Sequence, residues 1–231
     1  MTLRTLTPVE ARVLATLMEK ARTVPDSYPL SLNALVLGCN QKTSREPLME
    51  ISDDDARTAL QSLKTQSLVF EAATSRVSRF EHNFQRAAAV NEPQAVALGL
   101  LMLRGPQTAA ELRLNGERWY RFADADAAEA VLQGLLQRGD DGGQAMVLKL
   151  PKMPGMREAR WTHLLCGEPD ITALQAAASA PQRGDSDGLL ARLTALETTV
   201  ASLRADNQQL RTHIAHISEQ LGITLDDKSP L

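Results

Sequence analysis

The stretch that decides the fold is residues 52–70, which reads SDDDARTALQSLKTQSLVF. Ser52 and Asp55 have the spacing of a capping pair, in which side chains satisfy the free backbone N–H groups at a helix start. Apolar residues then recur at helical spacing, as Ala56, Leu60 and Leu63. The short apolar run at residues 68–70 is typical of a strand. The stretch therefore predicts a helix followed directly by a strand.

The residues on the amino-terminal side predict two more helices. Residues 7–10, TPVE, combine a capping box with a proline at the first helical position, and an apolar stripe follows. Two prolines at positions 25 and 29 then exclude a continuing helix. Ser31 can cap a second, shorter helix, which Gly38 should end.

A hairpin completes this first unit. Residues 77–80 predict a strand that pairs with residues 68–70 across a turn near Thr74 and Ser75. Three helices and then a hairpin, in that order, are typical of a winged helix-turn-helix domain. We therefore predict one such domain at residues 1–86.

The same order of elements recurs between residues 87 and 170. Residues 91–94 open a helix that the pair Gly105-Pro106 stops, and residues 108–111 are the capping box of a short helix that ends at Gly116. A third helix, capped by Asp124 or Asp126, and strands at residues 146–150 and 160–164 should follow. The third helices of the two units share a pattern, LQSL at 60–63 and LQGL at 132–135. We interpret this as an internal repeat, with a second winged-helix domain at residues 87–170.

Three motifs resemble the YceH-like family of bacterial proteins. They read TPVEARVL at residues 7–14, YPLSLNAL at residues 28–35 and PGMREARW at residues 154–161, in the order in which the family has them. The resemblance covers roughly residues 3–167. It implies a tandem winged-helix fold, mainly α with small β-hairpin wings (α+β). It implies no activity and no catalytic residue, because that family is uncharacterised.

The carboxyl-terminal part predicts a linker and a coiled coil. Residues 171–188 have the composition of a flexible linker. Residues 189–221 carry two apolar series, each with a period of seven, and residues 222–231 form a tail. The d series is Leu189, Leu196, Leu203, Leu210 and Ile217, and the a series is Leu193, Val200, Asn207, Ile214 and Leu221. Leucine at d and a single asparagine at a favour a parallel two-stranded coiled coil, and hence a homodimer. An amphipathic helix that packs on the chain's own domains is the alternative.

The composition narrows the functional classes. The net charge is −3, and no stretch is long and apolar enough to be a signal segment or to span a membrane, so we expect a cytoplasmic protein without membrane partners. The two cysteines, Cys39 and Cys166, are far apart and outside any CxxC pattern. We also find no phosphate-binding glycine loop and no zinc-protease motif. We therefore expect no enzymatic activity, no cofactor and no metal; the aspartates at 53–55 fit a helix start better than a metal cluster.

The leading functional hypothesis is a dimeric DNA-binding protein, a transcriptional regulator that contacts double-stranded DNA. The candidate residues are Lys42, Arg45, Arg57, Gln61 and Lys64 in the first domain, and Lys149, Lys152, Arg157 and Arg160 around the second wing.

Three aspartates at the base-facing end of the third helix, and a long connection before that helix, count against DNA. The wing cations could also be merely solvated, and Trp119 fits a core position better than a base-stacking one. The alternative is a protein-protein interaction adaptor or scaffold.

Overall fold

The computed structural model describes residues 4–72, 78–139, 143–152 and 156–170, together with four separate positions, Arg204, Asn207, Gln208 and Thr212. Residues 4–170 belong to one compact unit, and the four separate positions belong to a second one. The predicted linker and tail lie outside the described residues. So does the predicted coiled coil, apart from those four positions, which are helical. The heptad register and the dimer thus stay predictions.

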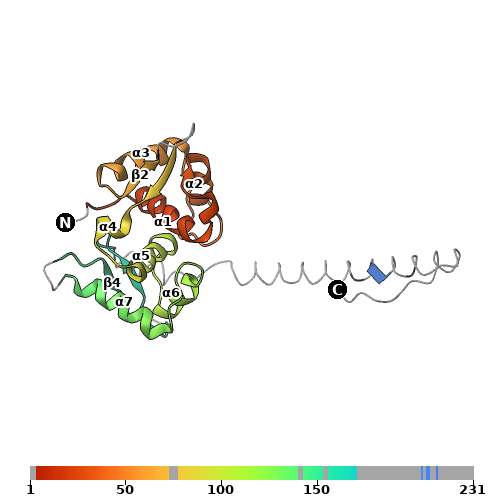
Figure 1. Ribbon diagram of the computed structural model, residues 1–231. Helices are drawn as coiled ribbons and strands as arrows, with labels where there is room; N and C mark the ends of the chain where they lie inside the picture. Colours follow the sequence, from red (N-terminus) through yellow and green to blue (C-terminus); the bar gives the residue numbers. More distant parts are fainter. Residues whose placement is uncertain are drawn as a thin grey trace. The chain divides into compact units, whose positions relative to one another are not determined.

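The first half of the compact unit contains three α-helices and a small antiparallel sheet (Figure 1). In chain order its elements are α1 (Pro8–Thr23), the 3-10 turn η1 (Pro25–Ser27), β1 (Leu30–Ser31), α2 (Leu32–Cys39), α3 (Asp53–Thr65), β2 (Val69–Ala72) and β3 (Arg79–His82). The strand order is β1-β3-β2. Leu30 lies opposite Phe80 and Val69 lies opposite His82. The two-residue strand β1, which the sequence did not predict, thus ties the start of α2 to the hairpin.

The second half repeats this arrangement. The helix α4 (Phe84–Ala88), also not predicted, leads into α5 (Glu92–Arg104), α6 (Ala109–Gly116), α7 (Ala125–Gln137), β4 (Val147–Lys149) and β5 (Trp161–His163). A single bridge joins Gln107, just before α6, to Trp161 in β5. Gln107 therefore occupies the place that β1 has in the first half, and in both halves this segment pairs with the second hairpin strand.

The helix starts follow from local hydrogen bonds. The Thr7 hydroxyl accepts the Glu10 N–H at 3.2 Å, while the Glu10 carboxylate accepts the Thr7 N–H at 2.6 Å. Ser52 with Asp55, Asn91 with Gln94 and Thr108 with Glu111 form the same reciprocal capping box. These predicted helix starts are confirmed. They could be predicted from the sequence because a capping box lies within four consecutive residues and needs no distant partner. The α2 helix ends at Cys39, one residue after the predicted end.

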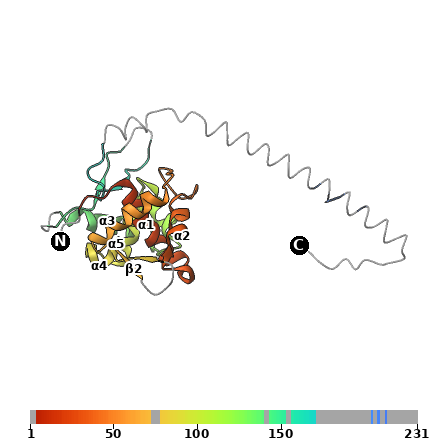
Figure 2. The ribbon, with the colours of Figure 1, turned by 90° about the horizontal axis from the view of Figure 1, so that it is seen from above.

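The helices α1 and α5 pack against each other at the centre of the compact unit (Figures 1 and 2). Residues 10–19 of α1 and residues 95–103 of α5 are all buried. A helix that is buried all round lies between other elements rather than on a surface. The two halves therefore share one core.

None of the helices in the described part of the chain has the length and apolar character of a membrane span.

The close packing around α5 predicts opposite effects for two glycine substitutions. A Cβ added at Gly99 would lie 2.7 Å from the Trp119 ring and 3.2 Å from Cε of Met18. We expect Gly99→Ala to be destabilising, because overpacking costs about 1–3 kcal/mol against about 1 kcal/mol of helix propensity gained.

The matched variant Gly134→Ala, in α7, meets no atom closer than 3.8 Å. It should stabilise the protein by about 0.4–1 kcal/mol. Urea unfolding followed by circular dichroism measures both free energies. If both variants were stabilised, the Trp119 ring would not be fixed against α5.

Candidate functional site

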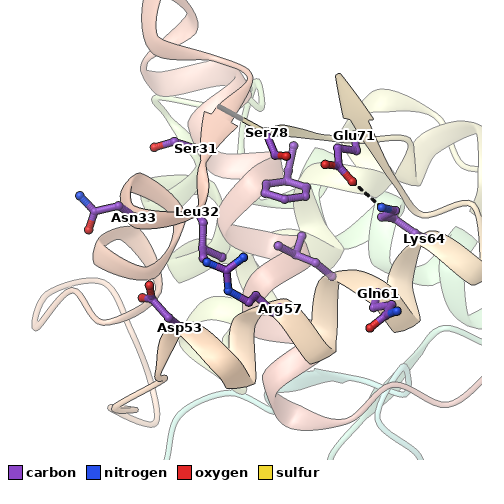
Figure 3. A pocket seen from close by; sticks show the side chains of 11 residues that line it. Ser31, Leu32, Asn33, Asp53, Arg57, Gln61, Lys64, Glu71 and Ser78 are labelled. Atoms are coloured by element: carbon purple, nitrogen blue, oxygen red, sulfur yellow. Dashed lines mark hydrogen bonds and ion pairs between the residues drawn. The ribbon is translucent and has the colours of Figure 1, made fainter. Parts of the chain in front are cut away.

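A groove of about 590 Å³ lies between the start of α2, the outer face of α3 and the β2–β3 hairpin (Figure 3). We call it the α3 groove. Its floor is apolar, because Leu60 and Phe80 are buried there. Its rim is polar. The lining residues are Ser31, Leu32, Asn33, Asp53, Arg57, Leu60, Gln61, Lys64, Glu71, Ser78 and Phe80.

The rim of the groove on the α3 side follows from the helical repeat. Asp53, Arg57, Gln61 and Lys64 are spaced by four, four and three residues, so they share one face of α3. The adjoining face carries the buried residues, which are Ala56, Ala59, Leu60 and Leu63, and Leu60 extends it to the floor of the groove. Arg57 extends from α3 toward the start of α2, beside Leu32 (Figure 3). The structure therefore brings three of the predicted DNA-contacting residues, Arg57, Gln61 and Lys64, to one groove.

The charges of the α3 groove are mixed. Nζ of Lys64 lies 2.5 Å from a carboxylate oxygen of Glu71, and this hydrogen bond lowers the pKa of Glu71. Both side chains are more than 30% exposed, so the pair contributes little stability. Arg57 has no ion pair within the described residues. The groove thus presents one unpaired guanidinium, one paired ammonium and the carboxylate of Asp53.

Arg45 does not belong to this surface, which corrects the predicted phosphate contact. Its side chain is fully buried, and its Nη2 lies 2.5 Å from a carboxylate oxygen of Glu19 in α1. The same guanidinium donates to the Gly38 carbonyl at 2.9 and 3.2 Å. The N–H groups of this guanidinium all donate to acceptors within the protein. Lys42, three residues earlier, is exposed.

The long connection between α2 and α3, which weakens the helix-turn-helix prediction, is fixed to the core. Arg12 of α1 donates to the carbonyls of Cys39 at 3.1 Å and Pro47 at 2.6 Å. From α5, Arg104 donates to the Ser44 hydroxyl at 2.7 Å. One signal in the sequence could have indicated this. Arg12 and Glu19 are seven residues apart, two helical turns, so both charged side chains lie on the same face of α1, within its buried stretch.

The second wing carries two paired and two unpaired cations. Lys149 lies 2.5 Å from a carboxylate oxygen of Glu129, and its Nζ is 5.1 Å from the centre of the Trp161 ring. Arg160 pairs with Glu111 at 2.7 Å and donates to the Pro106 carbonyl at 2.8 Å. Lys152 and Arg157 are exposed and have no ion pair among the described residues. The hairpin tip between them, at residues 153–155, is outside the described part of the chain.

The candidate residues thus form two separate groups. In Figure 1, α3 lies at one end of the compact unit, and α7 with β4 lies at the other.

Across the described ranges, no group of three or more His, Cys, Asp or Glu side chains could hold a metal ion. Trp119 is partly buried and its ring packs on α5 at Gly99, as the core interpretation expected.

Comparison with known proteins identifies the family. The model of the family described as "Protein of unknown function, DUF480" matches residues 6–156. A UPF0502 protein of Polaromonas sp. (strain JS666) is 74% identical, over 98% of this chain and 97% of the relative. Those of Polaromonas naphthalenivorans (61% identical, over 87% and 96%) and Delftia acidovorans (54%, over 94% and 93%) are also similar. The chain belongs to the DUF480 family, whose members among these relatives are named UPF0502 proteins.

Proposed function

We propose that the chain is a tandem winged-helix protein of the YceH-like type that binds double-stranded DNA, as a transcriptional regulator, through the α3 groove. The repeated order of helix, bridging segment, two helices and hairpin supports the tandem winged-helix part. In the first half the hairpin lies beside α3, because β2 contacts α3 and residues of both line the α3 groove. A recognition helix with a flanking wing has this arrangement.

The observation that carries the DNA proposal is the polar face of α3. Arg57, Gln61 and Lys64 lie on it at helical spacing, and all three are exposed. Arginine and lysine pair with the major-groove edge of guanine, and glutamine pairs with that of adenine. Arg57 is the strongest of the three, because no carboxylate among the described residues neutralises it.

The second wing has a smaller role in this proposal. Lys149 and Arg160 are already engaged by Glu129 and Glu111, so a DNA phosphate would have to compete with a carboxylate for each. Lys152 and Arg157 are the wing cations available for phosphate contacts. The coiled coil predicted at residues 189–221 would join two copies, and a two-fold dimer places two recognition helices on two half-sites.

A protein-interaction adaptor is the second candidate, and the mixed charge of the α3 groove favours it. Asp53 and Glu71 line the same groove as Arg57 and Lys64. Asp54 and Asp55 add two more exposed carboxylates to the first turn of α3. Such a surface repels phosphates locally but suits a peptide that carries both charges.

Fluorescence anisotropy of the full chain with pooled duplex DNA fragments, across a salt series, tests the two candidates. DNA binding predicts affinity that falls steeply with salt, because phosphate contacts release counterions. It also predicts that some fragments stay bound at physiological ionic strength. An absence of binding at low salt would favour the adaptor.

Within the same assay, Arg57→Ala tests the groove itself. We expect it to weaken binding of a selected fragment by about 1–3 kcal/mol, which is about fivefold to more than a hundredfold. Arg86→Ala is the matched control, since Arg86 is exposed in α4, has no ion pair within the described residues and does not line the groove. Equal losses in both variants would show that only net charge matters and would remove Arg57 as a base-reading residue.

A further inference from the structure

A second cavity, of about 290 Å³, lies where the two halves of the compact unit meet. We call it the junction cavity. The first half and α4 contribute Met18, Ala21, Arg22, Tyr28, His82 and Gln85. The second half contributes Glu92, Ala95, Val96 and Trp119. An occupant would therefore contact both halves at once.

The walls of the junction cavity are aromatic and fixed in place. The rings of Tyr28 and His82 meet edge to face, with their centres 6.3 Å apart and their planes at 64°. The Trp119 ring packs so closely on α5 that a Cβ at Gly99 would lie 2.7 Å from it. Met18 is buried beneath. Flat rings over an apolar floor favour a planar ligand, because aromatic pairs gain stabilisation beyond the area that they bury.

Apart from Arg22 and Glu92, the polar groups of the cavity are neutral. Burial lowers the pKa of His82 to about 4, with a smaller contribution from Arg22, so its imidazole is uncharged at neutral pH. Burial likewise raises the pKa of Tyr28 to about 12. The Tyr28 hydroxyl accepts the His82 backbone N–H at 2.7 Å, and no group in the described residues accepts its own proton. Gln85 adds an amide that both donates and accepts.

The charged groups of the lining compensate each other. Nη2 of Arg22 lies 2.5 Å from a carboxylate oxygen of Glu92. A neutral ligand leaves this pair intact, whereas a charged ligand finds a partner that is already engaged. The balanced charge of the lining thus favours a neutral ligand.

We propose that the junction cavity binds a small, neutral, planar nitrogen heterocycle of the nucleobase class. Its ring would lie against Trp119, and its polar edge would meet the Tyr28 hydroxyl and the Gln85 amide. The volume is at the lower end of that of ligand sites, which start at about 300 Å³, so it suits one or two fused rings. Because the cavity joins α1 to α5, binding stabilises the packing of the two halves. This proposal does not depend on DNA binding.

Adenine titrated into the full chain tests the proposal, with tryptophan fluorescence excited at the red edge, where adenine does not absorb. The chain has two tryptophans. Trp119 lines the cavity, while Trp161 is fully buried in β5. We expect saturable quenching from Trp119 and an increase of the melting temperature with adenine. Uracil and nicotinamide should compete, and benzoate and benzylamine, which carry opposite charges, should bind at least tenfold more weakly.

Two variants locate the site. Ala21→Phe fills the cavity from a half-exposed position of α1 and should weaken adenine binding at least tenfold, whereas Ala130→Phe, on the exposed face of α7, should not change it. Gln85→Ala removes only the amide and should weaken binding several-fold; it decides the question if Ala21→Phe does not fold. Three outcomes would each overturn the proposal. The first is unchanged affinity in the folded cavity variants, and the second is no saturable quenching by any of the three heterocycles. The third is binding of benzoate or benzylamine as tight as that of adenine.

Discussion

Replacing Arg45 by alanine is expected to destabilise the protein by about 3–5 kcal/mol, the usual result of removing one partner of a buried ion pair. The Arg45 side chain is fully buried and that of Glu19 is 12% exposed, with two nitrogen–oxygen distances of 2.5 and 3.2 Å. Without Arg45, the Glu19 carboxylate stays inside with Lys20, at 3.1 Å, as its remaining ion pair among the described residues, and the Gly38 carbonyl loses its Arg45 donor. Urea unfolding at neutral pH, followed by circular dichroism, measures the loss.

This destabilisation should shrink as the pH falls. Burial alone would raise the pKa of Glu19, but the hydrogen bond and charge of Arg45 outweigh it and hold that pKa below the ordinary value. A depressed carboxyl pKa contributes stability above the ordinary pKa, and this contribution is lost as the pH falls through the folded-state value. In the variant the pKa of Glu19 is higher than in the wild type, so the variant loses less on acidification.

Lys42→Ala is the control, because Lys42 is an exposed cation in the same connection and its loss should change stability by no more than about 0.5 kcal/mol. The loss of unfolding free energy in Arg45→Ala could also prove equal at neutral and acidic pH. The destabilisation would then come from lost packing rather than from lost charge.

The sequence predicted the elements whose determinants are local. The capping boxes at Thr7, Ser52, Asn91 and Thr108 each lie within four residues, and all four helices start where the sequence predicted a helix start. The hairpins were also located, with strand bounds that differ by one or two residues. The repeat could be recognised for the same reason, because each half carries its own local signals.

The sequence could not predict which candidate cations are available. Arg45 meets a glutamate 26 residues earlier, Lys149 meets one 20 residues earlier and Arg160 meets one 49 residues earlier. Such pairs form only after the helices pack, so a count of basic residues treats buried, paired and free cations alike. The strand β1 and the bridge at Gln107 were missed for the same reason, since their partners are 48 to 54 residues away. Arg57, Gln61 and Lys64 were found because helical spacing alone places them on one face.

Trp161→Ala is expected to destabilise the protein by about 3–5 kcal/mol, since it empties the volume of a large aromatic side chain. The Trp161 side chain is fully buried, and its Nε1–H donates to Glu129 of α7 at 2.7 Å. Its backbone exchanges two hydrogen bonds with Gln107, at 2.7 and 3.0 Å. Trp161 thus connects β5, α7 and the segment before α6.

Trp161→Phe separates packing from the hydrogen bond. It keeps a ring in the core and loses the indole N–H, while Lys149 still compensates the Glu129 carboxylate at 2.5 Å. A buried hydrogen bond contributes about 0.5–1.5 kcal/mol, or about 1.5–3 kcal/mol when one partner is charged, so Trp161→Phe should cost less than Trp161→Ala. Equal costs would show that the indole N–H, not the ring, holds the second half together.

The same Trp161 variants test whether the two halves are one cooperative unit. Because α1 of the first half packs directly on α5 of the second, a loss in the second-half core should lower the stability of both halves together. We therefore expect one unfolding transition for Trp161→Ala, seen at the same urea concentration by circular dichroism and by the fluorescence of Trp119. An early transition of Trp119 fluorescence, with the first half still folded, would show that the α1–α5 contact does not couple them. The junction cavity would then lie between two bodies that separate, and a ligand bound there would have to hold them together.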